Sequence, residues 1–356
     1  MPVLSDLKLD ELETALAQGG CRPSHARRLL RHFHDNCGNI DWEQLRAGRA
    51  VERLFDGPLK TRQSRIVART TASDRTVKLL IGFDNGGAVE SVLMPAYRAD
   101  RAAGCVSSQI GCAMGCDFCA STRGGLERSL CAGEIVEQFL HLKAEARSLG
   151  RRLSTLVFMG MGEPLLNLPA VVSAIELIAG PTTGALGGRQ ITVSTVGIVP
   201  GIDVLAAADL NVHLALSLHA PDDATRARIV PMNRRYPVRE IMDAAHRFEQ
   251  RTGRIPTIEY CMLAGVNDSD EQAGLLIELI GSMRAHVNLI PYNAIGPGLS
   301  GRTYERPASD RIDRFLRLLW DGGIVAHRRD TRGDDVNAAC GQLRERMTES
   351  AGTLGR

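Results

Sequence analysis

From residue 105 onward the sequence alternates between strand-like and helix-like segments, and this alternation restricts the possible folds more than any other feature. Short runs rich in β-branched residues are followed by longer segments whose apolar residues recur at helical spacing. Strands alternating with helices predict parallel βαβ units, so we expect an α/β protein with an open or partial β/α barrel. Its chemistry should lie at the carboxyl ends of the strands. The expected strands are 105–110, 154–159, 190–196, 211–218, 255–263, 286–290 and 323–328, and the expected helices include 132–149, 168–179, 238–251, 269–283 and 308–321.

The first hundred residues follow two other patterns. Residues 1 to about 75 contain segments with helical apolar spacing, one of which stops at Gly19-Gly20. Residues 76–95 have strand-like spacing and a turn signal at Asn85-Gly86-Gly87, which predicts a β-hairpin. We therefore expect a helical domain over 1–75, a hairpin extension over 76–98, a barrel over 99–345 and a tail over 346–356.

Composition indicates an ordinary globular protein. The 356 residues include 43 Lys+Arg and 41 Asp+Glu, with 44% hydrophobic and 24% charged residues, which excludes disordered and fibrous classes. No apolar run reaches the ~18 residues that a membrane span needs, and the acidic N-terminus does not resemble a signal peptide. We expect a cytoplasmic protein without a membrane partner. The net charge of +2 argues neither for nor against nucleic-acid binding.

The nine cysteines carry the clearest chemical signal. An odd number in an expected cytoplasmic protein argues against a disulfide framework. Cys112, Cys116 and Cys119 have the spacing C-x3-C-x2-C directly after an expected strand. Three thiolates can hold three irons of a [4Fe–4S] cluster and leave the fourth iron open. A zinc site would need a fourth ligand, and Cys131 and His141 are poorly spaced for it. Cysteines buried by chance remain the third alternative.

This motif resembles that of the radical S-adenosylmethionine (SAM) superfamily. More specifically, seven ordered blocks between residues 105 and 343 resemble the RlmN/Cfr family of radical SAM RNA adenosine methyltransferases. They are CVSSQIGCAMGCDFCAS, VFMGMGEPLLN, ITVSTVGIVPGI, LALSLHAPDD, IEYCMLAGVNDS, VNLIPYN and TRGDDVNAACGQL. The segment TRGDD is more similar to the RlmN branch. The resemblance implies a partial (β/α)6-type radical SAM barrel, preceded by the hairpin extension and by the helical domain, which in the family helps to engage the RNA.

The resemblance also implies a catalytic scheme. Cys340 is first methylated by one SAM, and a second SAM, reduced through the cluster, gives a radical that removes hydrogen from the S-methyl group. The resulting methylene radical adds to the adenine ring. Cys105 then helps to resolve the covalent protein–RNA adduct, which leaves a transient Cys105–Cys340 disulfide. Glu90 is implied as a proton acceptor, with a solvated carboxylate at a strand edge as the alternative.

A SAM pocket is implied at the ends of several strands. Each of its residues also fits a simpler role in a cap or turn, and for His219 a purely structural histidine is nearly as good an interpretation. Their recurrence at the carboxyl ends of strands favours the pocket. The expected SAM-binding residues are Gly162, Glu163, Ser194, Ser217, Leu218, His219 and Asn293.

We therefore expect a methyltransferase that acts on carbon 2 of an adenosine in 23S rRNA, with tRNA as an additional candidate substrate. The alternatives are methylation of carbon 8, a divergent member acting on another RNA, and a non-enzymatic iron–sulfur RNA-binding protein. The expected partners are RNA and an electron donor such as flavodoxin or ferredoxin, and we expect a monomer. Arginines that could contact phosphates, or simply form solvated helix faces, are Arg27, Arg28, Arg31, Arg311, Arg314, Arg317, Arg328, Arg329 and Arg332.

Overall fold

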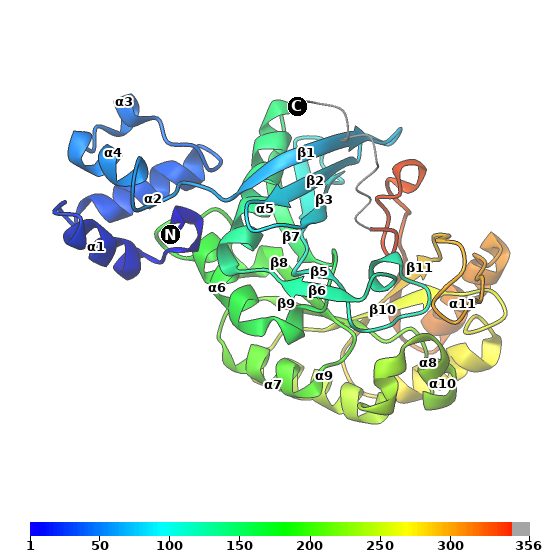
Figure 1. The fold of residues 1–356 in the computed structure, drawn as a ribbon. Coiled ribbons are helices and arrows are strands. Elements are labelled where there is room, and N and C mark those ends of the chain that lie inside the picture. Colours follow the sequence, from blue (N-terminus) through cyan, green and yellow to red (C-terminus); the bar gives the residue numbers. More distant parts are fainter. Residues whose placement is uncertain (344–356) are drawn as a thin grey trace.

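The computed structural model describes residues 1–343 and contains one large mixed β-sheet (Figure 1). The sheet has ten strands in the order β1-β2-β3-β4-β7-β8-β9-β10-β11-β12. From β4 to β12 all neighbours are parallel, whereas β1 to β4 are antiparallel. The strands are β1 Ser64–Thr71, β2 Val77–Phe83, β3 Ala88–Pro95, β4 Arg101–Cys105, β7 Arg152–Phe158, β8 Ile191–Thr195, β9 His213–Ser217, β10 Thr257–Met262, β11 His286–Pro291 and β12 Val325–Arg328.

Helices connect the parallel strands and cover the outer face of the sheet (Figure 1). All five helices expected after residue 105 are present in the structure, which also contains the short helices α7 and α8. The expected parallel strands after residue 150 are also confirmed. The helices are α5 Ala132–Ser148, α6 Leu168–Ala179, α7 Val199–Ala207, α8 Asp223–Ile229, α9 Val238–Thr252, α10 Asp270–Ile280 and α11 Ser309–Asp321. Short 3-10 turns are η1 Leu4–Asp6, η2 Ala120–Thr122, η3 Pro164–Leu166, η4 Gly188–Gln190, η5 Pro231–Arg234 and η6 Asp334–Val336.

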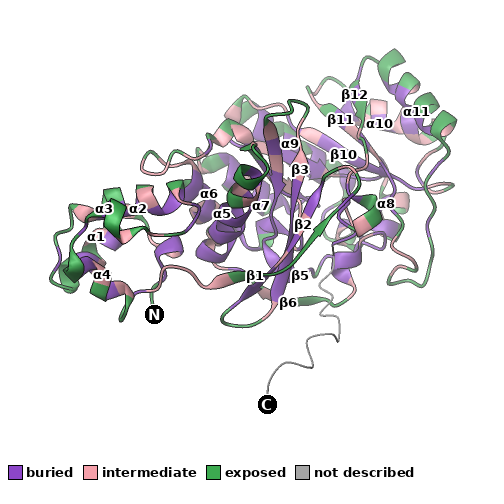
Figure 2. Cartoon of the chain, turned by 90° about the horizontal axis from the view of Figure 1, so that it is seen from above, coloured by how far each residue is buried: buried purple, intermediate pink, exposed green. Residues whose placement is uncertain are grey.

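The main core lies between the sheet and these helices, where Figure 2 shows buried residues on both layers. On α6, for example, Val171, Ala174, Ile175 and Ile178 are fully buried, at the three- and four-residue spacing of one helix face. Replacing such an isoleucine by alanine typically costs about 2–5 kcal/mol. This packed layer holds the strand ends in place, so loops at the carboxyl edge start from fixed positions.

The first barrel strand differs from the expectation over 105–110. β4 ends at Cys105, and β5 (Gln109–Gly111) pairs with β6 (Leu126–Ser129) in a separate two-stranded sheet. The chain leaves the large sheet at Ser107 and Ser108, whose backbone N–H groups donate to the Gln138 side chain and to the carbonyl of Met161 at 2.8 and 2.9 Å. These partners replace the ladder hydrogen bonds that a continuous strand would make.

The expected helical domain over 1–75 is confirmed in its first part, but the expectation is wrong for the last part, which contains β1. Helices α1 Leu9–Gln18, α2 His25–Asp35, α3 Trp42–Leu45 and α4 Arg49–Phe55 occupy the first part, but β1 pairs antiparallel with β2. The predicted hairpin is confirmed as β2 and β3, so the antiparallel part has three strands rather than two. Seven of the eight β1 residues are exposed, so the strand lacks the alternation of apolar and polar residues that would have revealed it.

The N-terminal helices α1 to α4 form a helical unit that lies to one side of the barrel (Figure 1). No helix among residues 1–343 has the length and apolar character needed to cross a membrane. The tail expected over 346–356 falls outside the described residues.

Candidate active site

One cavity opens at the carboxyl ends of the parallel strands and collects most of the predicted site residues. Its walls come from the loop after β5, the loop after β7, the ends of β8 and β9, strand β10 and the C-terminal segment. This is the edge at which α/β barrels hold their ligands. The predicted residues that line this first cavity are Cys112, Cys116, Cys119, Gly162, Glu163, Ser194, Ser217, His219 and Cys340.

Cys112, Cys116 and Cys119 are free thiols that enter the first cavity from one loop. The loop is fixed from behind, because the N–H of Asp117 donates to the carbonyl of Ile229 at 2.9 Å. Burial raises the pKa of Cys112 to about 12 and raises the pKa of Cys116 well above its ordinary value. These thiols therefore stay protonated until a metal takes the place of the proton.

The donor set fits an iron–sulfur cluster better than a single metal ion. In residues 1–343, no group of three or more His, Cys, Asp or Glu side chains is arranged to hold one ion. A zinc site needs all its sulfurs at ~2.3 Å from the same ion. In a cluster each thiolate binds a different iron, so the sulfurs lie farther apart around a shared cavity. Three free cysteines lining one cavity match the second arrangement.

Glu163 joins two loops of the first cavity through its carboxylate. One carboxylate oxygen accepts from the N–H of Leu165 at 3.0 Å and the other from the N–H of Val196 at 2.9 Å. Burial raises the pKa of Glu163 to about 7. The preceding Gly162 has φ +96°, and a Cβ there would lie 2.5 Å from the Cβ of Gln109, so only glycine fits. The pair thus brings a buried carboxylate close to the cavity without a side chain in front of it.

Two further strand ends supply neutral polar groups. The hydroxyl oxygens of Ser194 and Ser217 lie 3.3 Å apart at the ends of β8 and β9. His219 has φ +62°, and its Nδ1 accepts from the N–H of Cys261 at 3.0 Å. Burial lowers the pKa of His219 to about 3, so the ring is neutral and carries its proton on Nε2. Leu218 differs from its neighbours, because its side chain is fully buried and does not line the cavity.

A second cavity lies next to the first and contains both cysteines of the expected two-thiol chemistry. It is lined by Cys105, Asn293, Arg329 and Cys340, and it shares Arg329 and Cys340 with the first cavity. Cys340 is held in place because the N–H of Ala120 donates to the carbonyl of Gly341 at 2.7 Å. Burial raises the pKa of Cys105 to about 12, and the nearby Cys340 thiol acts in the same direction. Cys340 therefore borders both cavities.

Asn293 and Glu90 do not join the first cavity. Asn293 lies in the second, where its Nδ2 donates to the carbonyl of Cys340 at 3.2 Å. Glu90, on β3, is buried beside a third cavity and forms an ion pair with Lys78 at 2.8 Å. The backbone carbonyl of Glu90 accepts from the Ser107 hydroxyl at 2.8 Å, which links β3 to the turn after β4.

Arg329 was expected among the arginines that could contact phosphates, but the structure places it between the first two cavities. Its pKa is raised because it faces Cys340, the buried carboxylate of Glu259 and Cys105. By contrast, Arg311 and Arg314 both pair with Asp270, as expected of a solvated helix face.

Several buried polar residues around the site belong to no recognisable motif, so they could not be identified from the sequence. Their helical or strand positions look ordinary in the sequence, and only the fold brings them to the strand ends. Arg226 was not singled out although it is fully buried. Glu259 lines the first cavity, and its Oε2 has no hydrogen-bond partner within the described residues. The acidic and basic residues of these segments gave no signal that distinguished them from surface charges.

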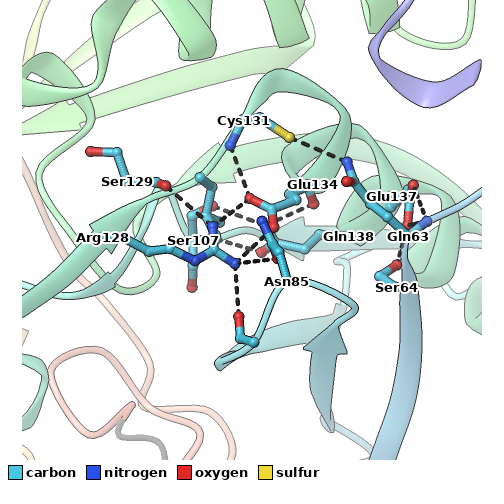
Figure 3. Close-up of polar contacts among 12 residues, drawn as sticks. Gln63, Ser64, Asn85, Ser107, Arg128, Ser129, Cys131, Glu134, Glu137 and Gln138 are labelled. Carbon is cyan, nitrogen blue, oxygen red and sulfur yellow. Dashed lines mark hydrogen bonds and ion pairs between the residues drawn. The ribbon is translucent and has the colours of Figure 1, made fainter. Parts of the chain in front are cut away.

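A buried amide on α5 holds the turn behind the cavity (Figure 3). The Gln138 Oε1 accepts from the N–H of Ser107 and from the hydroxyl of Ser91, both at 2.8 Å, and its Nε2 donates to the Ser107 carbonyl at 3.0 Å. The Ser107 hydroxyl in turn accepts from the N–H of Met161 at 2.9 Å. Gln138 therefore connects the helix layer to the loop that carries Gly162 and Glu163.

The same helix anchors the N-terminal unit (Figure 3). The Glu137 carboxylate accepts from the Ser5 hydroxyl at 2.6 Å, from the N–H of Gln63 at 3.0 Å, and from the Ser64 hydroxyl. Ser5 and Gln63 stand near the two ends of the helical unit, so one buried side chain holds both.

Comparison with known proteins agrees with this arrangement. Residues 106–277 match the radical SAM superfamily. The chain is 53% identical over 353 residues to a probable dual-specificity RNA methyltransferase RlmN 1 of Opitutus terrae, with 98% of both chains covered. It is 40% identical to a probable dual-specificity RNA methyltransferase RlmN of Rhodopirellula baltica, covering 98% of this chain and 92% of the relative.

A solved structure has the same fold along nearly the whole chain. It is a radical SAM methyltransferase from Sphaerobacter thermophilus, with a TM-score of 0.90 and 40% sequence identity. The alignment covers 97% of this chain and 99% of that one. From these similarities, which extend over the helical unit, the hairpin and the barrel, it follows that this chain belongs to the RlmN family within the radical SAM superfamily.

Proposed function

We propose that this enzyme is a radical SAM RNA methyltransferase that methylates carbon 2 of an adenosine in 23S rRNA through an S-methylcysteine on Cys340. The observation that carries the proposal is the position of Cys340, which borders both the cavity of Cys112, Cys116 and Cys119 and the cavity of Cys105. One thiol can therefore receive a methyl group from one side and meet a substrate on the other. The names of the relatives, which include a dual-specificity RNA methyltransferase, support RNA as the substrate class.

Cys112, Cys116 and Cys119 would hold a [4Fe–4S] cluster, since these three closely spaced thiols enter the first cavity from one loop. When bound, the cluster and SAM supply the one-electron chemistry that activates a methyl group. Glu163 offers a carboxylate to an ammonium group, and Gly162 leaves its approach open. Ser194, Ser217 and His219 supply hydroxyl and N–H groups, whereas Leu218 does not line this cavity and its carbonyl accepts from Arg226.

The chemistry of the substrate explains why two cysteines are needed. Carbon 2 of adenine is an electrophilic amidine carbon, so an electrophilic methyl group on a sulfonium finds no nucleophile there. Cys340 instead carries the methyl group until it can be delivered as a carbon radical. Cys105 then acts as the thiol that releases the covalent product from Cys340, and the shared second cavity supports this role.

Asn293 and Glu90 have separate parts in the proposal. Asn293 orients the Cys340 backbone through its hydrogen bond to the carbonyl, in place of a direct contact in the first cavity. Glu90 is the proposed proton acceptor, supported by its burial and by Lys78, which favours the ionised carboxylate. A Glu90→Gln variant should still methylate Cys340 but accumulate the protein–RNA adduct.

The proposal further requires RNA and a one-electron donor such as flavodoxin or ferredoxin. We also predict that the protein is a monomer and is located in the cytoplasm.

The proposed function is tested by anaerobic reconstitution with iron and sulfide, followed by turnover with an rRNA fragment or tRNA and methyl-labelled SAM. The RNA is digested and the modified nucleoside identified by mass and retention. 2-Methyladenosine is the expected product.

The other results of this experiment each contradict part of the proposal. 8-Methyladenosine would overturn the carbon 2 assignment while keeping the site. Methylated Cys340 without methylated RNA would show that the substrate is another RNA. No cleavage of SAM under reduction would leave a non-enzymatic iron–sulfur protein.

A further inference from the structure

Arg226 on α8 is a fully buried arginine that lies behind the first cavity. Arginine is almost never fully buried unless its charge is matched. It lies beside the ends of β8 and β9, which carry Ser194 and Ser217. The hydrogen-bond partners and the charged groups around the Arg226 guanidinium therefore indicate its role.

The guanidinium ties two strand ends together. Its Nε donates to the carbonyl of Leu218 at 2.8 Å, and its Nη2 donates to the carbonyls of Val196 and Ser217 at 2.5 and 3.2 Å. Its Nη1 donates to the Asn233 side chain at 3.1 Å. The planar fork of donors holds the ends of β8 and β9 at a fixed separation, which a single ammonium group could not do.

The positive charge itself has no carboxylate partner at ion-pair distance within residues 1–343. Asp223 is the acidic group that acts on it, but the Asp223 carboxylate accepts from Asn233 and from the N–H of Val238 instead. The other group that acts on it is the Cys116 thiol, whose loop is joined to the end of α8 because the N–H of Asp117 donates to the carbonyl of Ile229 at 2.9 Å. Burial lowers the pKa of Arg226 to about 10, so the side chain stays charged at neutral pH.

A buried charge without a counterion is costly, so an anionic group beside Cys116 would stabilise Arg226. Three thiolates on a [4Fe–4S] cluster in its oxidised 2+ state give a net charge of −1. One electron from an external one-electron reductant lowers this net charge to −2. A fixed positive charge in a low-dielectric interior stabilises the more negative state more strongly.

We propose that Arg226 is a positioning residue with two effects: its hydrogen bonds set the spacing of the strand ends that bind SAM, and its buried charge makes the cluster on Cys116 easier to reduce. This inference rests on the proposed function, because it assumes that Cys116 holds a cluster. Both effects come from one side chain. A lysine variant separates them, because it keeps the positive charge and removes the planar set of guanidinium N–H donors.

The experiment compares Arg226→Gln, Arg226→Lys and wild type, with Arg247→Gln as the matched control. Arg247 is an exposed arginine on α9 whose partner is Asp203. Each protein is reconstituted anaerobically, its iron and sulfide are counted, and its cluster is titrated with dithionite and mediator dyes while the reduced form is measured by electron paramagnetic resonance. SAM affinity is measured separately by equilibrium dialysis.

Arg226→Gln should lower the ratio of reduced to oxidised cluster at a given potential about tenfold, which for one electron is about 59 mV. Arg226→Lys should keep the wild-type potential but bind SAM about tenfold more weakly, because one ammonium cannot replace the fork. Arg247→Gln should match wild type in both measurements.

A fully loaded Arg226→Gln protein with an unchanged potential would overturn the electrostatic effect. If that variant fails to load, Arg226→Lys decides: an unchanged potential supports the proposal and a shifted one overturns it. Unchanged SAM affinity in Arg226→Lys would overturn the positioning effect. If wild type itself binds no cluster, the proposed function fails, whereas a loaded and active wild type confines any failure to Arg226.

Discussion

Cys105, the last residue of β4, and Cys340, in the C-terminal segment, line the same cavity, with Arg329 beside both. The two thiols are 235 residues apart, and in the sequence only the family resemblance implied that they meet. β4 fixes Cys105 through the packed sheet, and the contact between Ala120 and Gly341 fixes Cys340. The two positions are therefore set independently by the fold, which allows each thiol to be removed without displacing the other.

Replacing each thiol should give a different outcome. Cys105→Ala should trap a covalent enzyme–RNA adduct, because the thiol that releases it is gone, while Cys340→Ala should abolish both methylation and adduct. Denaturing gel electrophoresis with labelled RNA measures the adduct. Cys21→Ala, in the core of the helical unit, is the control and should form product as wild type does. Full activity in both active-site variants would disprove the two-thiol mechanism.

Removing any one of Cys112, Cys116 or Cys119 should prevent cluster assembly, since each thiol is expected to bind its own iron. The variants are cysteine to serine, and the measurement is iron and sulfide content after anaerobic reconstitution. Cys261→Ser is a matched control, because Cys261 is a buried free thiol that lines the same cavity. We expect it to retain the cluster. Retention of full iron by any of the three motif variants would contradict the assignment.

Glu163 should make the protein without cofactors less stable as the pH rises. Burial raises its pKa from 4.5 to about 7, so between these values the folded state keeps a proton that the unfolded state has lost. Stability therefore falls across that window, by at most about 3 kcal/mol, and is flat above it. Urea unfolding at several pH values measures the free energy of unfolding.

Glu163→Gln should reduce this pH dependence. The pKa values of Glu137 and Glu259 are also raised by burial, so some dependence remains and only the difference from wild type reports on Glu163. The variant should also bind SAM more weakly, because it has no charge for an ammonium group. An identical pH dependence in both proteins would show that Glu163 does not titrate in this window.

Gln138→Leu should destabilise the fold by about 3 kcal/mol or more, because it strands the buried Ser107 and Ser91 groups that Gln138 satisfies. The free energy of unfolding in urea measures the loss. Gln250→Leu, on the exposed face of α9, is the control and should change stability by no more than about 0.5 kcal/mol. Equal effects in the two variants would mean that the amide network contributes nothing.

The sequence was sufficient for the features that depend on local pattern. The alternation of apolar residues identified the parallel strands after residue 150 and their connecting helices, and Asn85-Gly86-Gly87 identified the hairpin. The cysteine spacing located the loop of Cys112, Cys116 and Cys119. Strand β1 was missed because its residues are nearly all exposed, so neither face shows an apolar period.

Features that depend on distant contacts could not be predicted in the same way. Glu90 and Asn293 stand in matching segments, but only the packed fold shows that they face the third and second cavities rather than the first. Arg226 and Arg329 look like surface arginines, because charge in a sequence carries no information on burial. Their environments are made by strand ends and loops far away in the chain.

The attachment of the helical unit has a mechanical consequence. Glu137 receives hydrogen bonds from Ser5 and from Gln63, and Leu4 donates to the carbonyl of Lys60 at 2.8 Å, so the unit enters and leaves the barrel at one point. Because both ends of the helical unit are attached to α5, its orientation relative to the barrel is restricted. Because this attachment joins both ends of the helical unit to the barrel, the distance from the unit to Cys340 is set by the fold.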